Sequence, residues 1–315
     1  CYQGFVRAGQ DYVLLDFPDH SNVGDSAIWL GELVLLRQIT GRAPCYVAAQ
    51  QIEWDLLDAI PADVPILLHG GGNFGDIWPL HQNLREEVIG RYPDRPVVQL
   101  PQTIFFGDEG RIARAAEVIA KHSDFTLLCR DQRSFDFAQH HFQCKLALCP
   151  DSAVVLSPER EQSPSRDLLL MLRDDLESAN QDGPEGRYVA EDWLEEPDDT
   201  RHRANRAARL ANPVATLTRN KMKRRETYYR KLAERRVSRG MRQLASARRI
   251  ISDRLHVHIL ATVQGIPHVA LDNSYGKISG LMETWNTQWD GVQVRETVDD
   301  AIRASGADPV DLRRR

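Results

Sequence analysis

The first half of the chain alternates short apolar runs with longer amphipathic stretches. The amphipathic stretches repeat apolar residues at helical spacing over residues 24–40, 80–91, 108–122 and 131–141. The apolar runs between and around them cover residues 12–17, 44–48, 65–70, 96–102, 125–131 and 145–151. Near-continuous apolar strands separated by helices are typical of a parallel sheet that is covered on both faces. We therefore predict a doubly wound α/β domain over residues 1–157.

A second set of elements follows a polar linker with two prolines, residues 157–166. Its apolar runs cover residues 167–175, 247–254, 267–274 and 291–296, and helical stretches cover residues 255–264 and 297–304. The pattern predicts a second Rossmann-like domain over residues 165–315, with a charged helical insertion at about 176–246. The predicted fold class is therefore α/β with two Rossmann-type doubly wound domains.

The insertion has an uneven charge pattern. Residues 174–199 carry eleven acidic side chains and one basic one, whereas residues 201–249 carry seventeen basic and two acidic ones. One interpretation is two solvated helices and a loop whose charges partly compensate each other. The other is a basic face that meets an anionic substrate or a membrane surface with anionic lipid. Nucleic acid is not expected, because the basic stretch has only two aromatics, Tyr228 and Tyr229.

Composition places the 315-residue chain among ordinary globular proteins, with 42% hydrophobic residues and a net charge of −5. No run approaches the roughly 18 apolar residues that a membrane helix needs. The five cysteines are scattered and form no CxxC pair, so neither a disulfide framework nor a zinc site is expected. A reducing, cytoplasmic compartment fits this cysteine usage best.

Unusual residues collect at the ends of the predicted strands, where open α/β sheets bind ligands. After the first run, Asn22, Gly24 and Asp25 form a turn that opens a helix. Asp25 is either part of the helix cap or a group that handles a substrate hydroxyl, a role that His20 could also take. The sequence leaves both readings of Asp25 open.

A glycine-rich segment, HGGGNFGDIW at residues 69–78, follows the third run. Gly70, Gly71 and Gly72, followed by Asn73, let the backbone approach a ligand closely and expose N–H groups to an anion. The spacing also satisfies GxGxxG, but the next strand lacks the acidic residue of a dinucleotide site. We therefore expect a sugar or phosphate here and not NAD. Gln102, which ends that next strand, could bond a sugar or simply form a turn.

Three arginines, Arg130, Arg173 and Arg254, each end an apolar run. One such arginine usually forms a surface salt bridge, but three that converge would bind a multiply charged anion, since each guanidinium offers a fork suited to phosphate or carboxylate. His256 follows Arg254 by two residues and can titrate near neutral pH. His258 lies on another helix face, so we predict no metal site.

The ordered set of motifs resembles the polysaccharide pyruvyl transferases, and most of all their bacterial exopolysaccharide members. The motifs are N-x-G-D near the start, HGGGNFGDIW, LPQTI, an Arg-Asp after the fifth strand, CPDSA, SDRLHVHILA and DNSYGKISG. The resemblance covers about residues 12–290, and SDRLH followed by DNSYGK is its most specific part. The basic stretch 201–240 matches no motif of the family.

The resemblance implies a GT-B-like fold, with two domains facing each other across a cleft. It implies transfer of pyruvate from phosphoenolpyruvate, the co-substrate, to a sugar as a cyclic ketal, with release of phosphate. No other cofactor and no metal are expected. The acceptor would be a lipid-linked oligosaccharide repeat unit at the cytoplasmic face of the inner membrane. The charge of the basic stretch 201–249, and not the resemblance, suggests peripheral contact with that membrane. The N-terminal domain would bind the acceptor and the C-terminal domain the donor.

The family's Arg-Leu-His motif falls on Arg254, Leu255 and His256. Phosphoenolpyruvate carries nearly three negative charges, so Arg254 with Arg173 or Arg130 would clamp it, and His256 would transfer a proton, with Asp25 as its partner. His256 could instead only donate a hydrogen bond to phosphate. The expected acceptor and loop residues are Asn22, Gly24, Gly70, Gly71, Gly72, Asn73, Gln102, Asn273, Tyr275 and Lys277.

Two other functions fit the same sequence. A nucleotide-sugar glycosyltransferase of GT-B architecture would use the same arginines for its anionic donor. A non-catalytic scaffold in polysaccharide assembly would use the basic stretch as a docking surface. Stabilisation by UDP or GDP would favour the first alternative, whereas an intact Arg254–His256 pair argues against the second.

Overall fold

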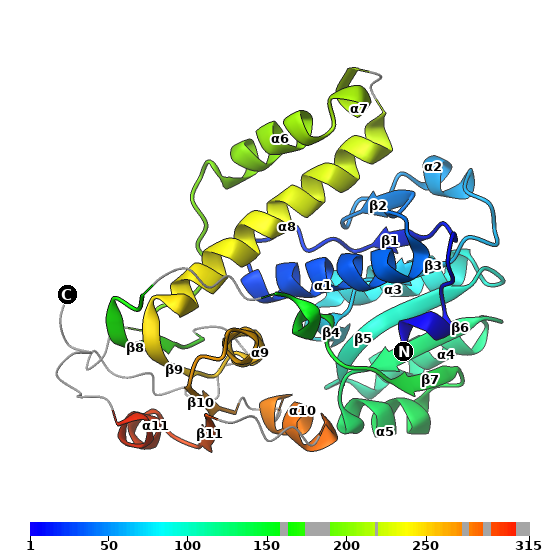
Figure 1. The fold of residues 1–315 in the computed structure, drawn as a ribbon. Coiled ribbons are helices and arrows are strands. Elements are labelled where there is room, and N and C mark those ends of the chain that lie inside the picture. Colours follow the sequence, from blue (N-terminus) through cyan, green and yellow to red (C-terminus); the bar gives the residue numbers. More distant parts are fainter. Residues whose placement is uncertain (158–162, 174–189, 218–219, 273–276, 286–290, 307–315) are drawn as a thin grey trace. The chain divides into compact units, whose positions relative to one another are not determined.

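The computed structural model describes residues 1–157, 163–173, 190–217, 220–272, 277–285 and 291–306. The chain forms two compact units (Figure 1). The first comprises residues 1–20, 25–155 and 198–234, and the second comprises residues 21–24, 156–197 and 235–315. The chain therefore passes between the units several times and does not divide at a single linker.

The first unit contains a seven-stranded parallel sheet in the order β2-β1-β3-β5-β6-β7, with β4 paired to β5. Its strands are β1 (Val13–Leu15), β2 (Tyr46–Ala48), β3 (Ile66–Leu68), β4 (Gly71–Gly75), β5 (Val97–Phe105), β6 (Phe125–Cys129) and β7 (Lys145–Leu148). The six apolar runs of the first half all became strands, and β4 is an additional one.

Helices cover both faces of this sheet, as the continuous apolar runs predicted. They are α1 (Val23–Thr40), α2 (Trp54–Asp58), α3 (Pro79–Arg91), α4 (Glu109–Ala120) and α5 (Gln132–His141). Successive residues of β1 point to opposite faces: Val13 packs in one core with Val88 of α3, and Leu14 packs in the other with Trp29 of α1. The alternation between two cores confirms the doubly wound architecture of this unit.

The second unit contains a four-stranded parallel sheet in the order β11-β10-β9-β8. Its strands are β8 (Arg166–Met171), β9 (Ala247–Ser252), β10 (His268–Leu271) and β11 (Val292–Arg295), and its helices are α9 (Leu255–Gln264), α10 (Lys277–Trp285) and α11 (Val298–Ser305). Leu170, Ile251 and Ile302 share its apolar core. Both units are thus α/β with parallel sheets, as predicted.

The charged stretch forms α6 (Thr200–Ala211), α7 (Pro213–Leu217) and α8 (Lys221–Ala245). We expected it as an insertion within the C-terminal domain, but residues 198–234 group with the first unit. The reason is apolar packing, because Ala204, Leu232 and Ala233 are buried in the core that contains Leu14. The predicted charge compensation is present where Glu196 pairs with Arg236 at 2.8 Å.

None of the described helices is both long and apolar enough to cross a membrane.

Candidate functional site

Arg254 occupies the N-cap position of α9, at the carboxyl end of β9. Its backbone N–H donates to Ser252 Oγ at 3.0 Å, and that hydroxyl donates to the Met171 carbonyl at the end of β8, at 2.6 Å. The residue is 3% exposed, and its guanidinium is paired with the Asp192 carboxylate. Asp192, which orients Arg254, was not singled out in the sequence, because only its place in an acidic run was visible.

Arg173 and Arg254 lie around a buried carboxyl group, Asp253. The Arg173 backbone N–H donates to Asp253 Oδ1 at 2.9 Å, while Oδ2 is buried without a hydrogen-bond partner among the described residues. Burial raises the pKa of Asp253 to about 6, against the smaller lowering effect of the hydrogen bond from Arg173 and the charges of Arg254 and Arg173. The backbones of two of the three predicted arginines are therefore close together at the ends of β8 and β9.

His256 lies in the first turn of α9 and packs against Gly24. A Cβ atom on Gly24 would lie 2.5 Å from His256 Nδ1 and 2.8 Å from its Cβ, so only glycine allows this approach. Asn22 caps α1, because its Oδ1 accepts the Gly24 N–H at 2.9 Å. Gly24, predicted for the acceptor side, therefore shapes the surroundings of His256. Leu255, which is 6% exposed, packs inside the unit.

Only part of the last motif, DNSYGKISG, lies among the described residues. Asn273 and Tyr275 lie outside the described residues. Lys277 is the first residue of α10, which starts after β10 because the N–H groups of Ile278 and Ser279 donate to Asp272 at 3.1 and 3.2 Å. The backbone of Lys277 is thereby held near the carboxyl end of β10.

In the first unit, part of the predicted glycine-rich loop is a strand. Gly71, Gly72 and Asn73 belong to β4, which pairs with β5. The expectation of an open loop there was wrong, because the glycines allow close backbone pairing: a Cβ on Gly75 (φ +137°) would lie 1.6 Å from the Phe105 carbonyl oxygen. Gly70 is held before β4 by its N–H, which donates to Glu32 at 2.8 Å.

Gln102 and Asn73 bond each other inside this unit. Gln102 Nε2 donates to Asn73 Oδ1 at 2.9 Å and to the His69 carbonyl at 3.1 Å, and its Oε1 accepts the Asn73 N–H at 3.2 Å. Arg85, buried at 3% exposure, also donates to Asn73 Oδ1 at 3.0 Å. Since Gln102 is fully buried, this geometry favours the structural alternative, in which Gln102 fixes β4, over a hydrogen bond to sugar.

A carboxylate–imidazole pair that the sequence did not reveal lies at the carboxyl end of β1. His81 Nδ1 of α3 is 2.9 Å from both oxygens of Asp16, and Gln50 Nε2 donates to Asp16 Oδ1 at 2.9 Å. Asp16 has a positive φ of 67°, a strained backbone for a residue with a side chain. An Asp-bound Nδ1–H leaves Nε2 able to accept a proton. The sequence shows only an Asp after a strand and a His in a helix, 65 positions apart.

Asp25 lies close to this end of the sheet. Its Oδ2 is 3.6 Å from His20 Nε2, and its Oδ1 is 3.8 Å from the position of a Cβ on Gly71. His69 is buried nearby, and its pKa is raised by Glu32, Asp16 and Asp25 against the opposing effect of burial. Carboxylates and imidazoles thus gather at the ends of β1 and β3 in the first unit.

Arg130 is buried and ion-paired, as Arg254 is, but its contacts are to strand ends of the first unit. It is 2% exposed, its NH1 donates to Asp151 Oδ2 at 2.7 Å, and its Nε donates to Thr103 Oγ1 at 2.8 Å. It also belongs to the first unit, whereas Arg173 and Arg254 belong to the second. These contacts favour a structural role at the ends of β6 and β7, and direct donor contact stays a prediction.

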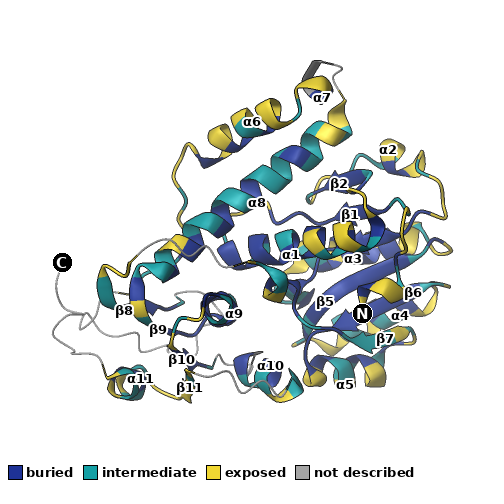
Figure 2. Cartoon of the chain, in the orientation of Figure 1, coloured by how far each residue is buried: buried dark blue, intermediate teal, exposed yellow. Residues whose placement is uncertain are grey.

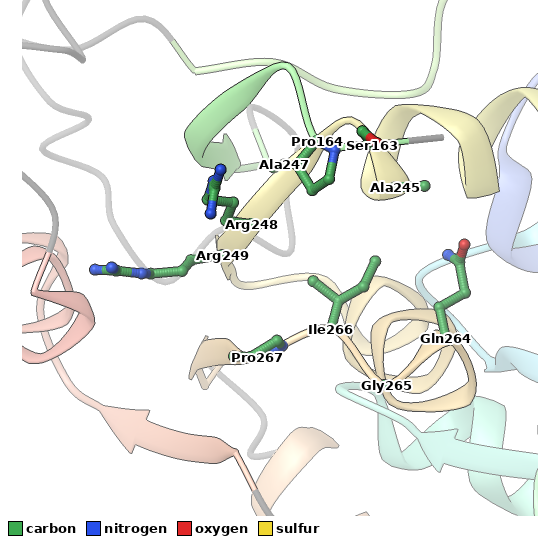
Figure 3. Close-up of a pocket in the computed structure, with 10 residues that line it drawn as sticks. All are labelled: Ser163, Pro164, Ala245, Ala247, Arg248, Arg249, Gln264, Gly265, Ile266 and Pro267. Atoms are coloured by element: carbon green, nitrogen blue, oxygen red, sulfur yellow. The ribbon is translucent and has the colours of Figure 1, made fainter. Parts of the chain in front are cut away.

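A cavity of about 750 Å³ in the second unit lies away from these residues (Figure 3). Pro164, Ala247 and Pro267 place it at the amino ends of β8, β9 and β10, the opposite end of the sheet from Arg254. One of its lining residues, Arg249, is bonded to the Ser305 carbonyl. The cavity therefore does not belong to the candidate site.

The buried Asp253 carboxyl predicts a pH-dependent gain in stability for Asp253→Asn. The raised pKa stabilises the folded state fully below about pH 4, and this contribution is lost as the pH rises through about 6. Asparagine does not titrate and can keep the bond from Arg173. We expect the variant to be more stable than the wild type by about 1 kcal/mol at pH 4.5 and by about 3 kcal/mol at pH 7.5, measured by urea denaturation. Exposed Asp299→Asn in the same unit is the control, and an equal difference at both pH values would contradict the prediction.

A family model and two relatives of known name indicate the same protein family. The family model described as "Polysaccharide pyruvyl transferase" matches residues 22–275. "Pyruvyl transferase 1" of Schizosaccharomyces pombe is 33% identical over 324 residues, covering 96% of this chain and 77% of that protein. "Putative pyruvyl transferase EpsO" of Bacillus subtilis is 27% identical, covering 87% and 85%. The crystal structure of a functionally uncharacterized protein from Klebsiella pneumoniae matches the fold with a TM-score of 0.60 at 16% identity, covering 91% and 94% of the two chains.

Proposed function

Because the chain belongs to the polysaccharide pyruvyl transferase family, we propose that it transfers pyruvate from phosphoenolpyruvate to a sugar of an exopolysaccharide repeat unit. The product is a cyclic ketal, and phosphate is released. The donor assignment rests on Arg173 and Arg254. Their backbones flank the buried Asp253 at the ends of β8 and β9, just before α9 begins. A lipid-linked acceptor at the cytoplasmic face of the inner membrane and a GT-B-like cleft stay predictions from the resemblance.

The donor side of the proposal rests on charge. Phosphoenolpyruvate presents a carboxylate and a phosphate, and Arg173 and Arg254 offer planar forks that match both groups. Arg254 is already oriented by Asp192, so little side-chain freedom is lost on binding. His256, packed against Gly24, is the residue we assign to proton transfer or to a hydrogen bond with the leaving phosphate.

The acceptor side rests on the Asp16–His81 pair. A sugar hydroxyl is a weak nucleophile and needs a base, and an imidazole held by a carboxylate is a common solution. We propose His81 Nε2 as this base, in preference to the Asp25 carboxylate that the sequence offered as a partner of His256. The end of β1 suits a neutral hydroxyl substrate, because the groups that meet there are Asp16, His81 and Gln50.

The reaction balances without a redox partner. A proton adds to the methylene carbon of phosphoenolpyruvate, and positive charge develops at the central carbon. One hydroxyl oxygen bonds to that carbon and loses its proton; the bond to phosphate then breaks, and the second hydroxyl takes its place. Of the two protons released by the hydroxyls, one replaces the proton used on the methylene and the other leaves with phosphate.

Thermal stabilisation by phosphoenolpyruvate tests the donor assignment, with UDP, GDP and inorganic phosphate beside it. At 100 times its dissociation constant a ligand stabilises the fold by about 2.7 kcal/mol. We expect this stabilisation in the wild type and its loss in Arg254→Lys, which keeps the charge but not the fork. Arg249→Ala, at the opposite end of the same strand, is the matched control, and His81→Gln should keep donor binding while losing transfer.

Three outcomes would overturn this proposal. Stabilisation by UDP or GDP, and not by phosphoenolpyruvate, would establish a nucleotide-sugar glycosyltransferase. Binding of phosphoenolpyruvate that Arg254→Lys leaves intact would place the donor elsewhere. Stabilisation by none of these anions would favour a non-catalytic role in polysaccharide assembly.

A further inference from the structure

The structure places an exposed cationic and apolar surface at the end of the helix pair formed by α6 and the first part of α8. We define the tip surface as Arg206, Arg209, Leu210, Val214 and Lys223. All five are exposed, and Leu210 and Val214 are 74% and 67% exposed. Figure 2 shows exposed positions along α6 and α7. Large aliphatic side chains this exposed among arginines and lysines call for an explanation.

The helices that carry the tip surface pack on the core of the first unit. Ala204 of α6 and Leu232 of α8 are buried in one core of the first unit. Tyr229 stacks on Phe17 with ring centroids 4.0 Å apart and an angle of 5° between the planes. The Asn220 N–H donates to the Ala215 carbonyl at 3.0 Å, which connects α7 to the first turn of α8. The five side chains are therefore presented by packed helices.

The cations of the tip differ from several other cations of the same helices. Arg201 is paired with Asp19, and Lys221 and Arg225 are both paired with Glu53. For Arg206, Arg209 and Lys223, the described part of the chain holds no ion-pair partner. No acidic residue occurs between positions 200 and 225. Unneutralised positive charge is thus concentrated where Leu210 and Val214 protrude.

We infer that the tip surface docks onto an anionic lipid bilayer, with Leu210 and Val214 entering the interface and the three cations meeting lipid phosphates. Apolar side chains flanked by Lys and Arg match the two layers of a membrane surface, which are an anionic headgroup region and the hydrocarbon below it. Nucleic acid or an acidic protein would use the cations but would gain little from two aliphatic side chains in their midst. The inference stands on the surface alone and does not depend on the group that the enzyme transfers.

Vesicle flotation of the full chain tests this inference. We expect binding to vesicles of 70% phosphatidylcholine and 30% phosphatidylglycerol at low salt, and much weaker binding to phosphatidylcholine alone or at 1 M salt. The triple variant R206Q/R209Q/K223Q should bind about 100-fold more weakly, at about fivefold for each charge removed. Replacing both aliphatic residues, in L210S/V214S, should weaken binding at least about tenfold.

Matched controls separate the tip from general charge. The double variant R7E/R37E reverses two exposed arginines of the same unit outside the helix pair, and it should float like the wild type. Melting temperatures should be equal for all variants, since every substituted side chain is exposed. The inference is overturned if the wild type floats with neither vesicle, which would leave the tip to a protein or nucleic-acid partner. It is equally overturned if the tip variants float like the wild type, or if R7E/R37E loses binding as strongly as the triple variant.

Discussion

Gly24→Ala is expected to lower transferase activity by about 100-fold or more while the protein remains folded. The added methyl group would lie 2.5 Å from His256 Nδ1 and 2.8 Å from His256 Cβ. Both atoms lie near the root of the imidazole, so the ring must move as a whole, and misplacing a catalytic group by about 1 Å can cost about two orders of magnitude. The measurement is the initial rate of phosphate release from phosphoenolpyruvate with acceptor, beside the melting temperature.

Gly90→Ala provides the matched control for this substitution. Gly90 lies in α3, and a Cβ atom there meets nothing within 4 Å. Its activity should equal that of the wild type, and its stability should be equal or slightly higher, because alanine is the better helix former. Full activity of a folded Gly24→Ala protein would show that the position of His256 does not limit the reaction.

Asp151→Asn is expected to lower the free energy of unfolding of the first unit by about 3–5 kcal/mol. The Arg130–Asp151 ion pair is nearly inaccessible, with side-chain exposures of 2% and 1% and a distance of 2.7 Å. Removing one partner of a buried ion pair leaves the other charge uncompensated in the protein interior, and this unpaired charge lowers the free energy of unfolding. Urea denaturation at pH 7 measures the difference.

An exposed ion pair in the same unit calibrates that experiment. Arg42 and Asp11 lie 2.6 Å apart, with side-chain exposures of 51% and 46%. Asp11→Asn should cost less than about 1 kcal/mol, because solvent screens the pair. If Asp151→Asn cost no more than Asp11→Asn, Arg130 would not depend on Asp151 for compensation, and its assignment to a structural role would be wrong.

Most of the strands could be predicted because parallel strands that are buried on both faces need continuous apolar runs. Runs such as 12–17 and 247–254 became β1 and β9 within a few residues at each end. The Arg254–His256 segment was also found, since it directly follows such a run. The strand β4 was missed, because its residues are glycines and Asn73, and close backbone pairing leaves no hydrophobic pattern.

The parts of the site that escaped prediction depend on contacts between distant segments. Asp16 and His81 meet only because α3 returns to the end of β1, and Asp192 reaches Arg254 from an acidic run 62 positions earlier. The tip of the charged stretch is similar: composition showed its net charge, but only burial and ion pairing separate Arg206 and Arg209 from Arg201. Local spacing carries no information about which of two arginines has found a carboxylate.

The contribution of residues 198–234 to the first unit has a consequence for biosynthesis. One apolar face of its sheet, which includes Leu14 and Trp29, is completed by Leu232 and Ala233. At about 5–20 residues per second, a ribosome needs about 4–16 s to extend the chain from residue 155 to residue 233. During that interval the sheet is finished but one of its faces is not fully covered. The nascent protein is therefore most prone to aggregation, and most dependent on chaperones, in the middle of its synthesis.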